Sequence, residues 1–597
     1  MTFKERLEGV KAMIKILKNF KAKEWLILLI SVMFIMCQVW LDLKLPDYMS
    51  EITKLVQTPG SEISEIAKSG GFMLLCAFGS LISSVTVACL AAKVATELSA
   101  RLRGKVFDRV QSFSMKEINN FSTDSLITRT TNDITQVQTF IVMGLQMLIK
   151  APILAIWAIF KITNKSWQWS AATGVAVLVL LVVVITCMVL ALPKMRKMQR
   201  LTDNINRVTR ENLTGIRVVR AYNAEAYETD KFAKANDELT NTSIFTNSVL
   251  SIMMPSISLI LNGLSLAIYW IGAVLINQAA VESKLGLFSD MIVFSSYAVQ
   301  VVMAFMMLIM IFILMPRASV AAKRINEVLD TKLSLDDGKI EKAPIAEAGE
   351  VEFKNVSFKY PDAAEYALQD ISFKVKKGEM IAFIGATGCG KSTLINLIPR
   401  FYDATEGEVL VDGINVKEYK QKTLRNLLGY VSQRATLFEG DITSNIVFGD
   451  CGKGEITQSE MMDAAYVAQA SEFIEKTEDE YKAHVAQGGT NLSGGQRQRV
   501  SIARAIARRP EIVIFDDSFS ALDYKTDRKL RGLLKKELAG TTMMVVAQRI
   551  GTIKEADQII VLDEGKIVGK GTHDELMANC EVYQEIAYSQ LSKEELA

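Results

Sequence analysis

A glycine-rich loop at residues 385–392 has the residue types and spacing that bind nucleotide phosphates. Its sequence, GATGCGKS, fits the pattern G-x-x-x-x-G-K-S and lies between apolar stretches typical of a strand and of a helix. Glycines let backbone N–H groups converge on phosphate oxygens, and the start of a helix adds positive potential. We expect Lys391 to reach the outer phosphates and the Ser392 hydroxyl to bind Mg²⁺. The alternative is a purely structural loop, which the strand and helix context disfavours.

Two consecutive aspartates stand within a second apolar stretch, VIFDDSFSALD, at residues 513–523. A carboxylate at the end of an apolar strand is a common way to hold Mg²⁺ against a nucleotide phosphate. Asp516 is sufficient for that role by itself. Asp517 therefore needs a separate function.

The composition indicates a membrane protein with a large soluble part. Of 597 residues 50% are hydrophobic, and 68 basic residues nearly balance 66 acidic ones, for a net charge of +2. This balance offers no concentrated basic field, so no nucleic-acid partner is expected. The seven cysteines are scattered without a CxxC pair, which favours free thiols. No removable secretion signal is expected at the N-terminus.

Long apolar runs in the first part of the chain predict a transmembrane domain of six helices in a lipid bilayer. A bilayer core of about 30 Å needs about 20 apolar helical residues, and runs of that length are informative. The predicted spans are 25–45, 71–95, 139–161, 167–193, 247–276 and 288–316. We expect no buried ion pair and no metal cluster within them. The alternative, a soluble helical bundle, would show polar stripes.

Basic residues in the flanking segments predict that both termini are cytosolic. Lysine and arginine concentrate before the first span and in residues 96–138 and 194–246. These two internal segments continue the helical pattern, so we expect four helices to extend beyond the membrane, with tips that could touch a soluble domain. Residues 3–17 carry apolar positions at helical spacing among lysines. This pattern is typical of a helix lying on an anionic leaflet, or of an extension of the first span.

Three further motifs identify the kind of nucleotide-binding domain. NLSGGQRQR at 491–499 opens a helix, IVIFD at 512–516 is an apolar strand, and SALD follows at 520–523. Together with Gln433 in YVSQ and Tyr360 in VSFKY, this order resembles the nucleotide-binding domain of ABC transporters over residues 350–590. Six spans followed by such a domain resemble an ABC exporter half-transporter.

The resemblance implies a fold and a set of site residues. The fold is an all-α six-helix transmembrane domain at 1–320, a linker at 321–349 and an α/β P-loop ABC nucleotide-binding domain at 350–597. Tyr360 would stack on adenine, as an aromatic face does without reading base edges. A core aromatic at a strand end is the alternative for this tyrosine. The ATP-binding residues would be Tyr360, Gly385, Ala386, Thr387, Gly388, Cys389, Gly390, Lys391, Ser392, Thr393 and Gln433. The Mg²⁺ site would involve Ser392, Gln433 and Asp516. The signature residues Leu492, Ser493, Gly494, Gly495 and Gln496 would contact ATP bound by a partner subunit.

Two positions depart from the family pattern at the catalytic residues. The family places glutamate after the Mg²⁺ aspartate to polarise the attacking water, and this chain has Asp517, whose carboxylate reaches about 1.5 Å less far. The family also places a γ-phosphate-binding histidine where this chain has Gln548, which cannot carry an imidazolium charge. A third departure, Gln487 for a common acidic residue, concerns the contact with the membrane helices. We therefore predict a slow, degenerate ATP site and an intact signature that serves a competent site on a second half-transporter.

The resemblance then implies an ATPase that drives export of hydrophobic or amphipathic molecules across the cell membrane, as half of a heterodimeric multidrug-type exporter. ATP binding would close the nucleotide domains, and hydrolysis at the partner's site would reset them. Methionines at 303, 306, 307 and 310 suit varied apolar cargo, although lipid-facing or packing roles explain them equally well. A lipid flippase and an ATP-gated channel of the same architecture are the alternatives.

Overall fold

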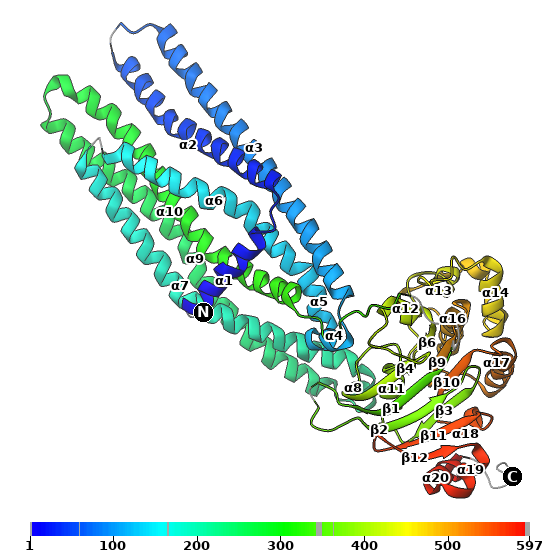
Figure 1. The fold of residues 1–597 in the computed structure, drawn as a ribbon. Coiled ribbons are helices and arrows are strands. Elements are labelled where there is room, and N and C mark those ends of the chain that lie inside the picture. Colours follow the sequence, from blue (N-terminus) through cyan, green and yellow to red (C-terminus); the bar gives the residue numbers. More distant parts are fainter. Residues whose placement is uncertain (1–2, 59, 164–165, 342–348, 362, 591–597) are drawn as a thin grey trace. The chain divides into compact units, whose positions relative to one another are not determined.

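The chain folds into two units in the computed structural model, which is drawn in Figure 1. The first comprises Met1–Gln111 and Asp124–Asp330, and the second comprises Ser112–Thr123 and Thr331–Ala597. The structure describes all residues except 1–2, 59, 164–165, 342–348, 362 and 591–597, so part of the predicted linker lies outside the described residues. The seven cysteines are free thiols, as predicted.

The first unit is entirely helical. Its helices are α1 (Phe3–Leu17), α2 (Ala22–Gln57), α3 (Ile63–Gln111), α5 (Thr123–Thr130), α6 (Asn132–Thr163), α7 (Trp167–Thr214), α8 (Ile216–Ala221), α9 (Glu225–Gln278) and α10 (Val281–Asp330). Six stretches of the described residues are long and apolar enough to cross a membrane, which confirms the six predicted spans. The longest helix, α9, has 54 residues. At about 1.5 Å per residue it is about 80 Å long, far more than a bilayer core requires.

The N-terminal helix α1 is separate from the first span and packs against α10. Met13 and Ile16 are buried. A Cβ placed on Gly9 would come within 2.7 Å of the Ser319 Cβ, so the two helices approach closely there. The Asn326 side chain on α10 donates a hydrogen bond to the Ala12 carbonyl at 2.9 Å. Residues 18–21 interrupt the helix before α2, so α1 is not a continuous extension of that span.

The membrane-spanning helices carry ion pairs, and one of them, Asp42–Lys150, is partly buried within the predicted spans, where no buried pair was expected. Asp42 on α2 pairs with Lys150 on α6 at 3.3 Å, and Asp47 pairs with Lys161 at 2.7 Å. The Tyr297 hydroxyl on α10 donates to Asp47 Oδ1 at 2.6 Å, whereas Lys161 contacts Oδ2. Lys150 stands near the middle of the third predicted span, where a lone charge would be costly. A partner of opposite charge on the adjacent helix makes it tolerable.

A six-stranded sheet forms the centre of the second unit. Its order is β12-β11-β3-β10-β9-β6, and β11, β3, β10, β9 and β6 run parallel. These strands are β3 (Met380–Gly385), β6 (Leu428–Val431), β9 (Ile512–Asp516), β10 (Thr542–Val546), β11 (Gln558–Asp563) and β12 (Lys566–Gly571). A second sheet, of order β2-β1-β4-β5, is antiparallel and contains β1 (Val351–Phe358), β2 (Leu368–Val375), β4 (Glu406–Val411) and β5 (Ile414–Asn415). A short pair joins β7 (Gly440–Asp441) and β8 (His484–Val485).

The parallel strands are apolar on both faces because each face has its own cover. In β9, Val513 and Phe515 belong to a cluster with the helices, whereas Ile512 and Ile514 belong to a cluster with the antiparallel sheet. Alternate residues of a strand point to opposite faces, which explains the unbroken apolar run in IVIFD. The strand order then brings the carboxyl ends of β3, β10, β9 and β6 side by side.

Helices of the second unit surround this sheet. They are α11 (Lys391–Asn396), α12 (Gln421–Asn426), α13 (Ile442–Ile446), α14 (Gln458–Val467), α15 (Ser471–Ile474), α16 (Gly494–Ala507), α17 (Tyr524–Glu537), α18 (Ile550–Ile553), α19 (His573–Asn579) and α20 (Glu581–Gln590). The fold class, six apolar helices followed by an α/β domain, is as predicted.

A segment from between the second and third spans belongs to this second unit. It contains α4 (Met115–Phe121), whose Asn119 donates to the Tyr402 hydroxyl at 3.3 Å. The Glu117 carboxylate accepts a hydrogen bond from the Ser334 backbone N–H at 3.1 Å. The prediction that the tip of this loop touches the soluble domain is thereby confirmed.

Candidate functional site

The glycine-rich loop follows β3 at the carboxyl edge of the parallel sheet. Gly385, Gly388 and Gly390 have φ angles of 153°, 89° and 99°, a region that residues with a Cβ rarely adopt. A Cβ on Gly385 would come within 2.0 Å of the Leu562 carbonyl oxygen. The loop conformation therefore requires glycine at these positions, and it leaves residues 386–388 exposed.

Lys391, at the start of α11, lies over this loop. Its ammonium group donates to the carbonyl oxygens of Gly385 and Ala386, each at 2.8 Å, and the side chain is buried. The Cys389 sulfur lies 3.5 Å from the same nitrogen. These contacts hold a positive charge within the loop, where the outer phosphates of a nucleotide would bind.

Ser392 and Asp516 meet across the sheet edge. The Ser392 hydroxyl donates to Asp516 Oδ1 at 2.9 Å. Burial raises the pKa of Asp516, and the neighbouring Asp517 carboxyl raises it further, while the Ser392 hydrogen bond opposes the shift. A divalent cation would reverse this shift. A hydroxyl and a carboxylate oxygen together are ligands that Mg²⁺ prefers, so these residues fit the predicted metal site.

The protein supplies few ligands to the predicted metal site. Among the described residues no group of three or more His, Cys, Asp or Glu side chains could hold a metal ion. A Mg²⁺ ion here would need oxygen ligands from elsewhere. Nucleotide phosphates and water supply such ligands in sites of this kind.

Asp517 accepts hydrogen bonds from two glutamine side chains. Its Oδ2 atom lies 2.8 Å from the Gln548 amide nitrogen and 3.3 Å from the Gln433 amide nitrogen. Burial raises the pKa of Asp517, while the Gln433 hydrogen bond and the charge of Lys391 oppose the shift. The residue has a φ of 46°, in the left-handed region that aspartate tolerates better than most residues. Both predicted catalytic residues, Asp517 and Gln548, are thus in contact.

The contact with Gln433 arises from strand order. Gln433 follows β6, Asp517 follows β9 and Gln548 follows β10, and these three strands are neighbours. Gln433 directs its amide nitrogen to Asp517. The structure therefore does not place the Gln433 side chain as a ligand of the predicted metal site.

Tyr360 lies just beyond β1, with its hydroxyl 3.0 Å from the Thr393 hydroxyl. Its ring is edge-on to the rings of Phe358 and Tyr402, with centroids 4.9 Å and 5.4 Å away. Tyr360 is half-buried. The tyrosine is therefore fixed beside the glycine-rich loop, and both the stacking role and the packing role remain compatible with this position.

The signature residues begin α16. Ser493 is the N-cap, its hydroxyl accepts from the Gln496 backbone N–H at 3.3 Å, and the Gln496 side chain accepts from the Ser493 N–H at 2.8 Å. Ser493 and Gly494 are exposed, whereas Leu492 packs against the hydrophobic cluster of the helices. Gly495 follows in the first turn. The hydrogen bonds of this cap are local, and the ones described do not join it to the glycine-rich loop.

Gln590 is a functional candidate that could not be predicted from the sequence. Its side chain binds the main chain at Gln548 and Ile550. No motif marks it, because one glutamine near the end of an amphipathic helix is common. Only the fold brings it to residue 548.

Comparisons with known proteins agree with this architecture. The profile of a family described as "ABC transporter" matches residues 368–520, and that of the "ABC transporter transmembrane region" matches residues 28–305. An uncharacterised ABC transporter ATP-binding protein of Mycobacterium tuberculosis is 40% identical over 521 residues, 87% of each chain. An ATP-dependent lipid A-core flippase of Pseudomonas syringae is 32% identical over 82% of this chain and 79% of the relative. A solved structure of a bacterial Atm1-family ABC exporter with ATP bound aligns with a TM-score of 0.77 and 25% identity, over 95% of this chain and 99% of that one.

Proposed function

This chain belongs to the ABC transporter family as an exporter half-transporter with a fused ATPase domain, and on that premise we propose that it is the degenerate-site subunit of a heterodimer. In this proposal it exports hydrophobic or amphipathic molecules. Its own P-loop binds ATP and hydrolyses it slowly. Its signature residues complete a faster site on the second subunit.

The observation that carries the proposal is the double hydrogen bond at Asp517 Oδ2. A general base needs a free lone pair directed at the attacking water, within about 2.6–3.2 Å of it. Here Gln433 and Gln548 both donate to one oxygen of a carboxylate that is already short by one methylene. The two hydrogen bonds occupy Oδ2, and the one from Gln433 opposes the rise in the pKa of Asp517 that burial causes. This arrangement supports slow hydrolysis with nucleotide binding retained.

In the proposed cycle this chain's residues bind and orient ATP. Backbone N–H groups of the glycine-rich loop and the Lys391 ammonium hold the phosphates, Tyr360 supports the adenine, and Ser392 with Asp516 would hold Mg²⁺. When bound, Mg²⁺ neutralises charge on the outer phosphates. Domain closure would then switch access to the cargo path, and opening would follow hydrolysis at the partner's site.

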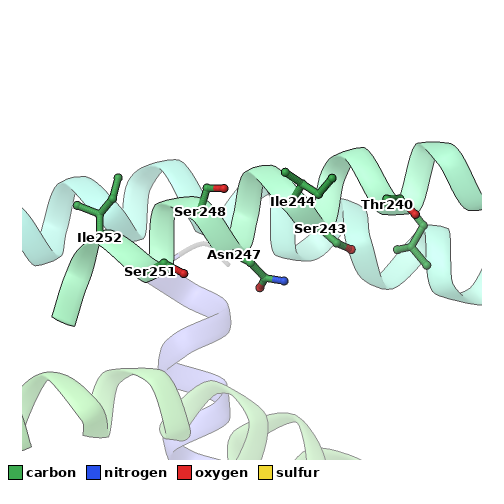
Figure 2. A pocket seen from close by; sticks show the side chains of 8 residues that line it. Thr240, Ser243, Ile244, Asn247, Ser248, Ser251 and Ile252 are labelled. Carbon is green, nitrogen blue, oxygen red and sulfur yellow. The ribbon is translucent and has the colours of Figure 1, made fainter. Parts of the chain in front are cut away.

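An open face of α9 with both polar and apolar side chains supports the need for a second subunit. Thr240, Ser243, Asn247, Ser248 and Ser251 line one side of this helix, with Ile244 and Ile252 among them, as Figure 2 shows. On another side of the same helix, Thr242 and Thr246 are buried. Because α9 continues into a membrane span, uncovered hydroxyl and amide groups beside exposed isoleucines there call for another helix. We assign this face to the interface with the second subunit.

The ion pairs of α2 and α6 favour amphipathic cargo over purely apolar cargo. Both signs of charge occur in the membrane-spanning helices, at Asp42, Asp47, Lys150 and Lys161. A molecule with a zwitterionic or multiply charged head group could exchange with these partners. Relatives described as lipid A-core flippases favour a lipid as the second candidate cargo. The positive-inside pattern supports a cell-membrane location, with both termini and the ATPase domain in the cytosol.

Co-purification followed by mass identification of the bound protein tests the heterodimer. The ATPase rate of the chain purified alone provides the second measurement. We expect a second half-transporter in the complex and little turnover by the chain alone. Brisk turnover by the homodimer would disprove the degenerate site. Translocation of labelled lipid in liposomes, compared with export of a cationic dye, would separate the two cargo classes.

A further inference from the structure

The last turn of α20 is joined to the segment that carries Gln548. The Gln590 side chain donates through Nε2 to the Gln548 carbonyl oxygen at 2.7 Å. Its Oε1 atom accepts from the Ile550 backbone N–H at 2.9 Å. A carboxamide is both donor and acceptor, so one side chain binds the main chain on both sides of Arg549.

The helix that presents Gln590 is anchored in the core. Tyr583 and Ala587 are fully buried in the cluster that covers the parallel sheet. The Tyr583 hydroxyl lies 2.8 Å from His573 Nδ1. Residues 583, 587 and 590 share one face of the helix, since they are four and then three positions apart. The burial of Tyr583 and Ala587 orients α20, and Gln590, itself exposed, then lies next to residues 548–550.

Gln548 connects this anchor to the candidate catalytic carboxylate. Its carbonyl group receives the hydrogen bond from Gln590, and its side chain donates to Asp517 Oδ2 at 2.8 Å. The Gln548 side chain itself is exposed, with its backbone at the end of β10. A flexible exposed amide is oriented chiefly by the main chain that carries it.

We infer that Gln590 is a positioning residue, which fixes the main chain at 548–550 so that Gln548 can contact the γ-phosphate of ATP in this chain's own P-loop. The inference rests on the proposed function and on a γ-phosphate role for Gln548, which stands where the family has a γ-phosphate-binding histidine. It predicts that Gln590 increases affinity for ATP and leaves affinity for ADP unaffected, because ADP has no γ-phosphate.

Photolabelling with 8-azido-ATP and 8-azido-ADP tests this on the full-length chain in its assembled complex. The gel band of this chain reports its own site without a contribution from the partner's P-loop. Gln590→Ala should weaken ATP binding about 2- to 10-fold, the effect of losing one or two hydrogen bonds, with unchanged ADP binding. Gln584→Ala is the matched control. Gln584 lies on the same helix and donates to the Met577 carbonyl at 2.8 Å, away from residue 548, so neither affinity should change.

A double variant separates positioning from general destabilisation. If Gln590 acts through Gln548, then Gln548→Ala with Gln590→Ala should match Gln548→Ala alone. Three results would each overturn the inference. The losses of ATP affinity in the two single variants could multiply in the double variant, Gln590→Ala could weaken ATP and ADP binding equally, or Gln590→Ala could bind ATP like the wild type. If Gln548→Ala itself kept the wild-type preference for ATP, the γ-phosphate role of Gln548 would be wrong as well. If Gln548→Ala lost that preference and Gln590→Ala did not, only the positioning role would fail.

Discussion

On the P-loop side of the nucleotide site the backbone conformation determines which residues are possible. On the Asp517 side the arrangement depends on hydrogen bonds between side chains. Gly385, Gly388 and Gly390 hold φ values that demand glycine, and Lys391 is tied to backbone oxygens of the same loop. Asp517 and Gln548 instead contact each other through a hydrogen bond between their side chains. A phosphate-binding surface made of backbone groups is altered little by side-chain substitutions. A surface made of side chains can lose its role in hydrolysis through one substitution while nucleotide binding persists. The degenerate site that we propose is the second kind of change.

The largest expected effect lies outside both surfaces, at the signature. Ser493→Ala on this chain should reduce the ATPase rate of the proposed heterodimer ~10²-fold, because in our proposal the Ser493 hydroxyl donates to the γ-phosphate of the partner's ATP. Thr457→Ala is the matched control, since Thr457 caps α14 with the same type of capping box. Asp517→Ala should cost less than about twofold if the site is degenerate. Steady-state ATPase assays with the partner unchanged measure all three. Loss of turnover by Asp517→Ala as complete as that by Ser493→Ala would make Asp517 a working base.

The next effect tests the P-loop side. Lys391→Ala should lower the ATP affinity of this chain's site about 10- to 100-fold, because a charge-assisted contact is lost. Asp517→Ala should leave the affinity within about twofold, since it removes no phosphate ligand. Nucleotide titration of the purified complex distinguishes the two. Abolished binding in Asp517→Ala would mean that this aspartate is a metal ligand, contrary to the separate roles proposed for Asp516 and Asp517.

A gain of function would sharpen the comparison further. Asp517→Glu combined with Gln548→His should raise the ATPase rate of the chain purified alone by about tenfold, provided that this chain's own signature can cap the phosphate. Glutamate tolerates the left-handed backbone at 517 less well than aspartate, so the gain should fall short of a fully placed base. The single Gln548→His variant is the control for the charge alone. An unchanged ATPase rate in the double variant would mean that residues 517 and 548 are not the cause of slow turnover.

The smallest effect concerns stability and pH. Burial raises the pKa of Asp517, so the folded protein binds this proton more tightly than the unfolded chain does. The carboxyl group's contribution to stability is therefore complete below its unfolded pKa and is lost as the pH rises through the folded pKa. Asp517→Asn should raise the melting temperature of the nucleotide-free protein at neutral pH, and the gain should vanish on acidification. A gain that grew as the pH fell would contradict the raised pKa.

Much of this architecture follows from local sequence pattern, and the parts that do not have a physical reason. The glycine-rich loop and the spans depend on residues close in sequence, so spacing and hydropathy predict them. The Lys150–Asp42 pair cannot be predicted in this way, because a mean hydropathy over a long apolar window hides one charge and the two residues lie on different helices. The three-way contact at Asp517 depends on the order β10-β9-β6, which no local pattern encodes. Gln590 lies 42 residues after Gln548, and the helix that bears it is unremarkable in sequence.

The placement of α4 in the second unit limits how this protein can be divided. A gene fragment that began at residue 331 would encode the whole sheet and every helix around it, yet it would lack the segment that binds Ser334 and Tyr402. Recombination between relatives at that joint would pair the ATPase domain of one with the α4 of another, and the two surfaces would have to match again. The heritable module is therefore discontinuous along the chain, and it takes in twelve residues from between two membrane spans, Ser112–Thr123.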